Sequence, residues 1–277
     1  MNYPQEIHDW QRHRLRKLTA EDGWATLVGL YWLEPGDNGF GRAASNAMAM
    51  DYPGVPEQLG TFRLQDAQVS FTAASGAGVM HAGRPVSRLG PLIGDSSGQP
   101  TLLTIGSLSF HLVERGGRFG IRVRDNRAAT RTHFKGLEYL TIDARWRLVA
   151  HVEPYQPVKA VPIVNVLGME EMMPSPGVLA FEIDGRQYRL EAVLEPGVSD
   201  YFVMFTDQTN GKQTYAAGRC LYVPPPVDGR TVIDFNKSYN PPCCFSAFAT
   251  CALPQAANRL PIAVTAGELR YVGANHP

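Results

Sequence analysis

The sequence lacks a long hydrophobic run. No segment approaches the roughly 20 consecutive apolar residues that a membrane-spanning helix needs. Residues 1–10 include Gln5, Glu6, His8 and Asp9, so they contain no apolar core of the kind found in signal peptides. We therefore predict a cytoplasmic protein that does not associate with a membrane.

An excess of one charge is also missing. The 277 residues carry 26 basic and 26 acidic side chains, which leaves a net charge of zero. General nucleic-acid binders usually show a basic excess or a basic run, so we expect no nucleic-acid partner. The sequence has no Gly-x-Ser-x-Gly, no glycine-rich phosphate loop and no His-Glu-x-x-His. Whether the protein is an enzyme stays open at this point.

Cysteine is scarce. The four cysteines, Cys220, Cys243, Cys244 and Cys251, show no Cys-x-x-Cys spacing and no paired histidines nearby, so we expect no metal and no cofactor. In the cytoplasm they should be thiols, and most should act as small buried hydrophobes. Cys243 and Cys251 are eight positions apart, which leaves a disulfide within geometric reach. A nucleophilic Cys243 would need a base, and no histidine lies near it in the sequence.

The patterns that are present predict a mostly β protein. A helix is expected over residues 4–19, followed by the apolar run 24–33. Regularly spaced short strands and turns then favour an antiparallel sandwich. Asp184-Gly185 between two alternating segments predicts a type I′ hairpin in which Phe181 faces Tyr188. We expect an N-terminal helix and apolar segment (residues 1–33), a β-sandwich (34–115) and a second antiparallel sheet or barrel-like C-terminal β domain (116–277).

One segment resembles a known family. The stretch Asp234–Cys243 reads DFNKSYNPPC, and it is followed by Cys251, by Asn258-Arg259-Leu260 and by Ala266-Gly267-Glu268. This pattern resembles a bacterial and archaeal family catalogued only as a domain of unknown function. The resemblance extends over nearly the whole chain and implies no activity.

Residues 36–114 resemble a forkhead-associated β-sandwich. The likeness rests on Asn38-Gly39-Phe40-Gly41-Arg42, on Val69-Ser70 and on Gly83-Arg84-Pro85-Val86. Such domains bind phosphothreonine through loop residues, and Arg42 and Ser70 match two of these. The histidine expected soon after the serine is missing, and Ala82 stands where an asparagine is expected. The resemblance therefore implies the sandwich fold without phosphopeptide binding.

The loop Asp234–Cys243 is the main candidate site. It follows a predicted strand, and Pro241-Pro242 should stiffen it, which lowers the entropic cost of holding a ligand. Alternatively, its polar side chains satisfy the backbone of the loop itself. Charged residues beside apolar strands either form structural ion pairs or supply a carboxylate base and a cationic clamp. Arg122 and Arg124 form either a solvated sheet face or an anion site that shares a cleft with Lys237.

Our leading hypothesis is a C-terminal β domain that binds a small anionic molecule. One alternative is a hydrolase that uses Asp207, Asp234 or Glu268 with Lys237. Another is a protein-interaction scaffold built on the N-terminal sandwich. The oligomeric state stays open. The candidate ligand-binding residues are Arg122, Arg124, Asp207, Arg219, Asp234, Asn236, Lys237, Tyr239, Asn240, Cys243 and Glu268.

Overall fold

A computed structural model describes residues 2–273 as two compact units. The smaller unit is Thr19–His133, and the larger one joins the residues through Leu18 to those from Phe134 onward. The sequence predicts a boundary near residue 116, whereas the units divide at residue 133. No helix within residues 2–273 is long and apolar enough to cross a bilayer.

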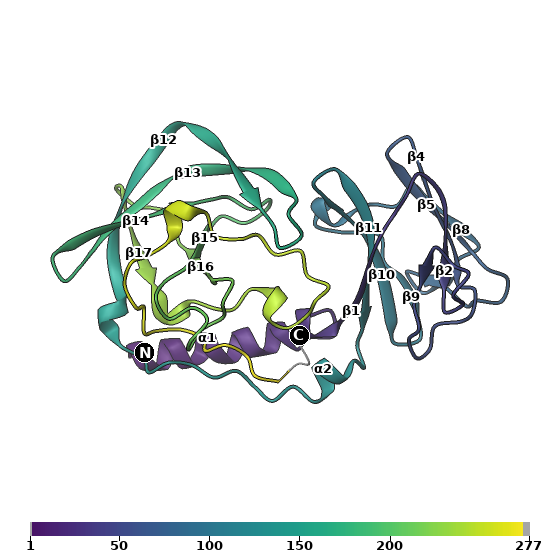
Figure 1. The fold of residues 1–277 in the computed structure, drawn as a ribbon, viewed down its shortest axis with the longest axis horizontal. Helices are drawn as coiled ribbons and strands as arrows, with labels where there is room; N and C mark the ends of the chain where they lie inside the picture. The colour runs from purple at the N-terminus through teal and green to yellow at the C-terminus, as the bar shows by residue number, and fades with distance from the viewer. Residues whose placement is uncertain (1, 274–277) are drawn as a thin grey trace. The chain divides into compact units, whose positions relative to one another are not determined.

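The larger unit is built on a curled antiparallel sheet. Its strand order is β14-β13-β12-β17, and a second ladder pairs β15 with β16. Figure 1 shows the sheet curling over β15 and β16, with helix α1 on the opposite side. The fold is therefore mostly β with an N-terminal helix, as the sequence predicts. The bounds are α1 Tyr3–Leu18, β12 Arg147–Val164, β13 Glu170–Ile183, β14 Arg186–Ala192, β15 Tyr201–Phe205, β16 Arg219–Val223 and β17 Arg230–Asp234.

The predicted hairpin of the larger unit is confirmed. Phe181 pairs with Tyr188 across β13 and β14, and the turn residues Asp184 and Gly185 both have positive φ. Positive φ at both central residues defines a type I′ turn, which matches the twist of the flanking strands. Phe181 also packs against Phe235, with ring centroids 5.7 Å apart, so the hairpin contributes directly to the core.

Helix α1 has the charge distribution that stabilises a helix. Glu6 lies in its first turn, and Arg16 and Lys17 lie in its last turn, which complements the helix dipole. Ile7 and Leu18 are fully buried. The helix therefore docks through one apolar face onto its own unit.

The smaller unit consists of two sheets. One has the order β1-β11-β10-β9-β6-β7 and the other β3-β2-β4-β5-β8. All pairs are antiparallel except the short pair β2–β3. The bounds are β1 Leu27–Trp32, β2 Gly36–Gly41, β3 Met48–Ala49, β4 Gly60–Gln65, β5 Gln68–Ala73, β6 Met80–His81, β7 Arg84–Pro85, β8 Arg88–Leu89, β9 Leu103–Ile105, β10 Leu108–Arg115, β11 Arg118–Asp125 and the short helix α2 Ala129–Thr132.

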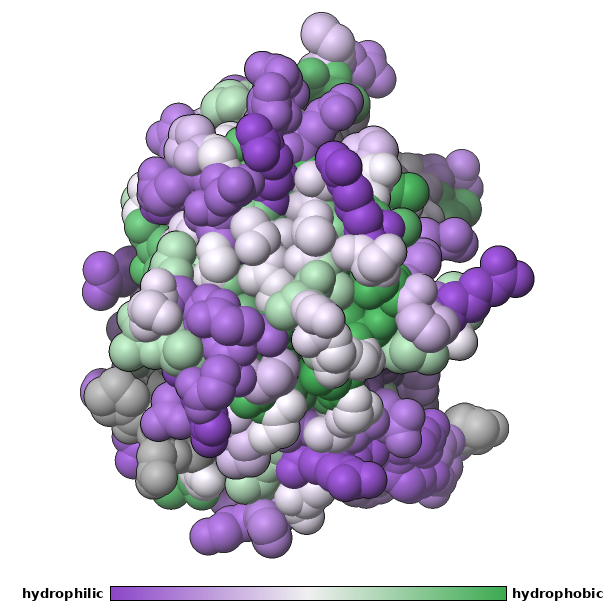
Figure 2. Space-filling model, turned by 90° about the vertical axis from the view of Figure 1, so that its right-hand side faces the viewer, coloured by the Kyte–Doolittle hydropathy of each residue, from purple (hydrophilic) through white to green (hydrophobic). Residues whose placement is uncertain are grey.

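The two sheets of the smaller unit share one core. Phe40 and Phe62 from the five-stranded sheet lie in the same buried cluster as Phe110 and Val123 from the six-stranded sheet. Phe40 and Phe110 meet edge to face with centroids 5.5 Å apart. Figure 2 views the molecule from the side where β4, β5 and β8 lie, and hydrophilic residues there surround small apolar areas. The apolar side chains of this unit are thus gathered between the sheets.

Candidate functional site

The first half of the loop Asp234–Cys243 binds the start of helix α1. Asp234 ends β17, and its Oδ1 accepts a hydrogen bond of 2.9 Å from the hydroxyl of Tyr3. The amide of Asn236 donates to the same hydroxyl at 2.8 Å and to the carbonyl of Asp143 at 2.9 Å. The Oδ1 of Asn236 accepts from the backbone N–H of Asp143 at 3.0 Å. These side chains therefore join three segments that are distant in the sequence.

Lys237 also points to helix α1. Its Nζ lies 2.6 Å from Oε1 of Glu6 and 4.0 Å from Oδ2 of Asp234. The hydrogen bond from Lys237 lowers the pKa of Glu6. The lysine side chain is 27% exposed, so this pair is partly open to solvent.

The second half of the loop converges on Arg14. The Nε of Arg14 lies 2.9 Å from Oε1 of Glu268, and its terminal nitrogen donates to the carbonyl of Asn240 at 2.9 Å. The guanidinium stacks on the ring of Tyr239, 4.6 Å from its centroid. The side chain of Glu268 is fully buried, and it also accepts from the backbone N–H of Asn240 at 2.8 Å. Burial opposes the charged form of Arg14, yet Glu268 raises its pKa.

Asp207 and Arg219 form a separate pair inside the larger unit. Both side chains are fully buried, and the terminal nitrogen of Arg219 lies 2.6 Å from Oδ2 of Asp207. The guanidinium also donates to the carbonyl of Val264 at 3.0 Å. Burial lowers the pKa of Arg219, and Asp207 opposes that shift. A buried pair of this kind is held by the surrounding fold.

The candidates of the larger unit are thus engaged chiefly by groups of their own chain. Within residues 2–273, the buried Oδ2 of Asp234 and Oδ1 of Asn240 have no hydrogen-bond partner. Arg14, the partner of Glu268, lies 254 positions away and is not among the candidate residues predicted from the sequence. No local signal marks a partner at that distance.

Cys243 lies in a group of sulfur and hydroxyl atoms. Its backbone N–H donates to the Sγ of Cys251 at 3.1 Å, and the hydroxyl of Tyr215 donates to its carbonyl at 3.1 Å. Cys243 is 8% exposed and all four cysteines are free thiols. Among residues 2–273, no three histidine, cysteine or carboxylate side chains come close enough to hold a metal ion.

Arg122 and Arg124 lie in the smaller unit, while Lys237 belongs to the larger one. On β11 they point to the same side as Arg118, because side chains two residues apart share one face of a strand. Across the ladder, Arg122 pairs with His111 and Arg118 pairs with Arg115 of β10. This face of β10 and β11, with four arginines and one histidine, is named the cationic face.

Asp95 and the rings of Trp24 and Trp32 lie against the cationic face. Asp95 binds Arg115 through two hydrogen bonds of 3.0 and 2.6 Å, and one of its oxygens lies 3.8 Å from Arg122. The guanidinium carbons of Arg122 and Arg124 lie 5.4 and 5.9 Å from the ring centroid of Trp24. Asp95 is thus committed mainly to Arg115.

The surroundings of Arg124 are positively charged and poorly solvated. Burial lowers the pKa of the Arg124 guanidinium, although Asp22 and Asp95 attract it. Within residues 2–273, its Nε has no hydrogen-bond partner. Burial, together with Arg124 and Arg122, lowers the pKa of the adjacent His111 from 6.5 to about 3. The histidine is therefore kept neutral mainly by burial, and the two arginines add to this effect.

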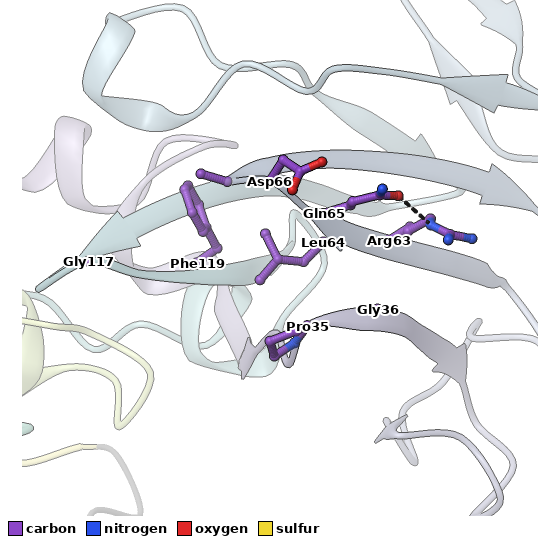
Figure 3. Close-up of a pocket in the computed structure, with 9 residues that line it drawn as sticks. Pro35, Gly36, Arg63, Leu64, Gln65, Asp66, Gly117 and Phe119 are labelled. Carbon is purple, nitrogen blue, oxygen red and sulfur yellow. Dashed lines mark hydrogen bonds between the residues drawn. The ribbon is translucent and has the colours of Figure 1, made fainter.

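A shallow depression also lies on the smaller unit. It has a volume of about 460 Å³ and is open to solvent. Its lining includes Pro35, Gln65, Asp66 and Phe119, and the side chain of Arg63 donates to Gln65 at 3.3 Å (Figure 3). Arg63 and Asp66 balance each other in charge, and nothing in the lining forms a catalytic pair. The depression therefore lacks the excess of positively charged side chains that marks the cationic face.

Comparison with known proteins identifies a family. Residues 132–269 match the family described as "Protein of unknown function (DUF1684)". The chain is 31% identical to an uncharacterised protein of Haloarcula marismortui solved by NMR in solution, over 50% of this chain and 79% of that one, with a TM-score of 0.43. No curated protein is similar to the chain. The resemblance predicted for nearly the whole chain is thus found over residues 132–269, which match the DUF1684 family.

Proposed function

We propose that this protein binds a small oxyanion, the phosphate or carboxylate group of a small molecule, at Arg122 and Arg124 of the cationic face. The observation that carries the proposal is the half-buried guanidinium of Arg124, which sits beside Arg122 and whose Nε has no hydrogen-bond partner among residues 2–273. Buried charges usually have partners, because desolvating an isolated charge is costly. A bound anion would supply that partner.

The electrostatics of the cationic face support an anion over a neutral ligand. Arg115, Arg122 and Arg124 lie near Asp95 and Asp22, and Arg118 shares their face of the sheet, so positive charge is in excess. His111 stays neutral there because protonation would add another positive charge to a desolvated site. Guanidinium groups bind carboxylates and phosphates through pairs of hydrogen bonds, which favours a planar or tetrahedral oxyanion.

The shape of the site favours a small ligand. The ring of Trp24 lies against both guanidinium groups and restricts their orientation. A side chain held in this way loses less entropy when it binds a ligand. Arg122 is only 2% exposed, so a ligand would contact Arg124 first.

The candidate residues of the larger unit give less support to a ligand site. Asp207 and Glu268 are fully buried and bind Arg219 and Arg14. A hydrolase that used them would have to break these pairs before either carboxylate could act as a base. Lys237 is already bound to Glu6, so it is less available to an anion than Arg124 is.

Calorimetric titration with inorganic phosphate, sulfate and citrate at fixed ionic strength tests the proposal. Arg124→Gln should weaken binding about ten- to a hundredfold, because a hydrogen bond to a charged group contributes about 1.5–3 kcal/mol. The matched control is Arg84→Gln, which removes the same charge from an exposed position on β7. It should bind like the parent protein.

Three results would overturn the proposal. The first is absence of binding of all three anions to the parent protein. The second is equal affinity of the Arg124→Gln and parent proteins. The third is an equal loss in both variants, which would mean that net charge alone attracts the anion.

A further inference from the structure

We propose that Cys243 and Cys251 form a redox-active pair, in which Cys243 is the attacking thiolate and Cys251 the resolving thiol. A hydroperoxide is the oxidant class that the pair would reduce. The pair lies in the larger unit and is independent of the oxyanion site on the smaller one.

The two sulfur atoms have a short path to each other. The Sγ of Cys251 lies 3.1 Å from the backbone nitrogen of Cys243, and its thiol is within hydrogen-bonding reach of the Cys243 sulfur. The nitrogen and the Cβ of Cys243 are bonded to the same Cα, so rotation about χ1 sweeps its sulfur past Cys251. A disulfide therefore needs side-chain rotation with little movement of the backbone.

Nearby donors lower the pKa of the Cys243 thiol. The hydrogen bond from the Cys251 thiol contributes most, the Tyr215 hydroxyl and the backbone N–H of Cys243 add to it, and burial opposes them. The bond to Cys243 raises the pKa of Cys251. The two cysteines therefore have different roles: the thiolate of Cys243 is the nucleophile, and the neutral thiol of Cys251 can give up a proton.

The other two cysteines provide an internal contrast. Burial raises the pKa of Cys244 to about 12, and burial also raises the pKa of Cys220 far above its usual value. Cys220 is 4% exposed and lies within β16. Both should stay protonated and unreactive at neutral pH. Reactivity should therefore be confined to Cys243 and Cys251.

Cys251 is the more exposed member of the pair. Cys243 is 8% exposed, whereas Cys251 is only partly buried. Phe248, between them in the sequence, is 37% exposed, so the segment that joins the two cysteines lies at the surface. Hydrogen peroxide is small enough to approach a partly buried thiol at the surface.

The chemistry balances in two steps. The Cys243 thiolate attacks one oxygen of hydrogen peroxide, the O–O bond breaks, and the departing hydroxide takes a proton to become water, leaving a sulfenic acid. The sulfur of Cys251 then attacks the Cys243 sulfur. The S–S bond forms, the S–O bond breaks, and a second water leaves with the proton of Cys251. The two thiols are oxidised by two electrons, and the peroxide is reduced to two waters.

Treatment of the full-length protein with hydrogen peroxide, followed by thiol counting, tests the pair. The count should fall from four to two in the parent protein and from three to one in Cys244→Ser. Chymotryptic mass spectrometry should find Cys243 joined to Cys251, since Phe245 and Phe248 lie between them. Cys251→Ser should instead accumulate a sulfenic acid on Cys243, which dimedone traps.

A second variant keeps the test informative if a cysteine variant unfolds. Tyr215→Phe removes one donor and should raise the pKa of Cys243. A smaller fraction of Cys243 would then be thiolate at neutral pH, so its oxidation should slow. Any of four results would overturn the proposal. After peroxide treatment the parent protein could still show four thiols, or its disulfide could be lost in Cys244→Ser. Cys251→Ser could form no dimedone adduct, or Tyr215→Phe could be oxidised at the same rate as the parent.

Discussion

Replacement of Arg14 by methionine should strongly destabilise the larger unit. Arg14 is the cation that faces the fully buried carboxylate of Glu268 at 2.9 Å. After Arg14→Met, Glu268 keeps the backbone N–H of Asn240 at 2.8 Å and a long contact of 3.5 Å from the hydroxyl of Tyr139. Removing one partner of a buried ion pair costs about 3–5 kcal/mol, because the other charge stays buried and unpaired.

Stacking adds to this cost. The guanidinium of Arg14 lies 4.6 Å from the ring centroid of Tyr239, and a contact of this kind contributes about 0.5–2 kcal/mol. The total is a large fraction of the 5–15 kcal/mol that separates typical folded and unfolded domains. Arg12→Met is the matched control on the same helix. Its side chain is 57% exposed beside Asp9, so its change should stay within about 0.5 kcal/mol.

Urea unfolding followed by hydrogen exchange and mass spectrometry measures both variants, and it reports helix α1 separately from Thr19–His133. The double variant Arg14→Met/Glu268→Gln should regain part of the loss, because the amide leaves no buried charge. Equal stability of Arg14→Met and Arg12→Met would refute the reasoning. If Arg14→Met/Glu268→Gln were no more stable than Arg14→Met, the unpaired charge of Glu268 would not be the cause of the lost stability.

Three other changes test single features. The pKa of His111 is lowered to about 3, so the unfolded chain binds its proton first and stability should fall from pH 6.5 towards pH 3, by up to about 1.4 kcal/mol per pH unit. Urea unfolding of His111→Gln across this range should show a smaller slope, and an unchanged slope would contradict the assignment. Lys237→Ala should cost less than about 1 kcal/mol, because its pair with Glu6 is partly exposed, and it should leave phosphate affinity unchanged by calorimetry. Gly267→Ala should cost about 3 kcal/mol in thermal unfolding, because Gly267 has φ +85° and its Cβ would overlap Ser238. A melting temperature equal to that of the parent would contradict that geometry.

Local features of the fold were predictable from the sequence. The hairpin at Asp184-Gly185 formed as predicted, because the turn and the alternation of its strands are encoded within a dozen residues. The helix predicted over 4–19 lies at Tyr3–Leu18 for the same reason. The boundary near residue 116 fell instead on Gly116-Gly117, two residues with positive φ that turn β10 into β11. Two glycines mark a hairpin turn as readily as they mark a linker.

The surroundings of the candidate residues depended on distant parts of the chain. Alternation along β11 placed Arg122 and Arg124 on one face, but Trp24 and Asp95 reach that face from segments outside the β10–β11 hairpin. The partner of Glu268 comes from a helix 254 positions away. Spacing along the sequence defines which residues share a strand face, whereas burial and ion pairing depend on which segments pack together.

The most direct test of oxyanion binding is a crystal structure with selenate, a sulfate analogue whose selenium is located by anomalous scattering. We predict a selenium peak within hydrogen-bonding distance of the Arg124 guanidinium and next to Arg122. The peak should disappear in Arg124→Gln crystals of the same form. Anomalous density absent from Arg122 and Arg124, or retained at that position in Arg124→Gln, would contradict oxyanion binding at these arginines.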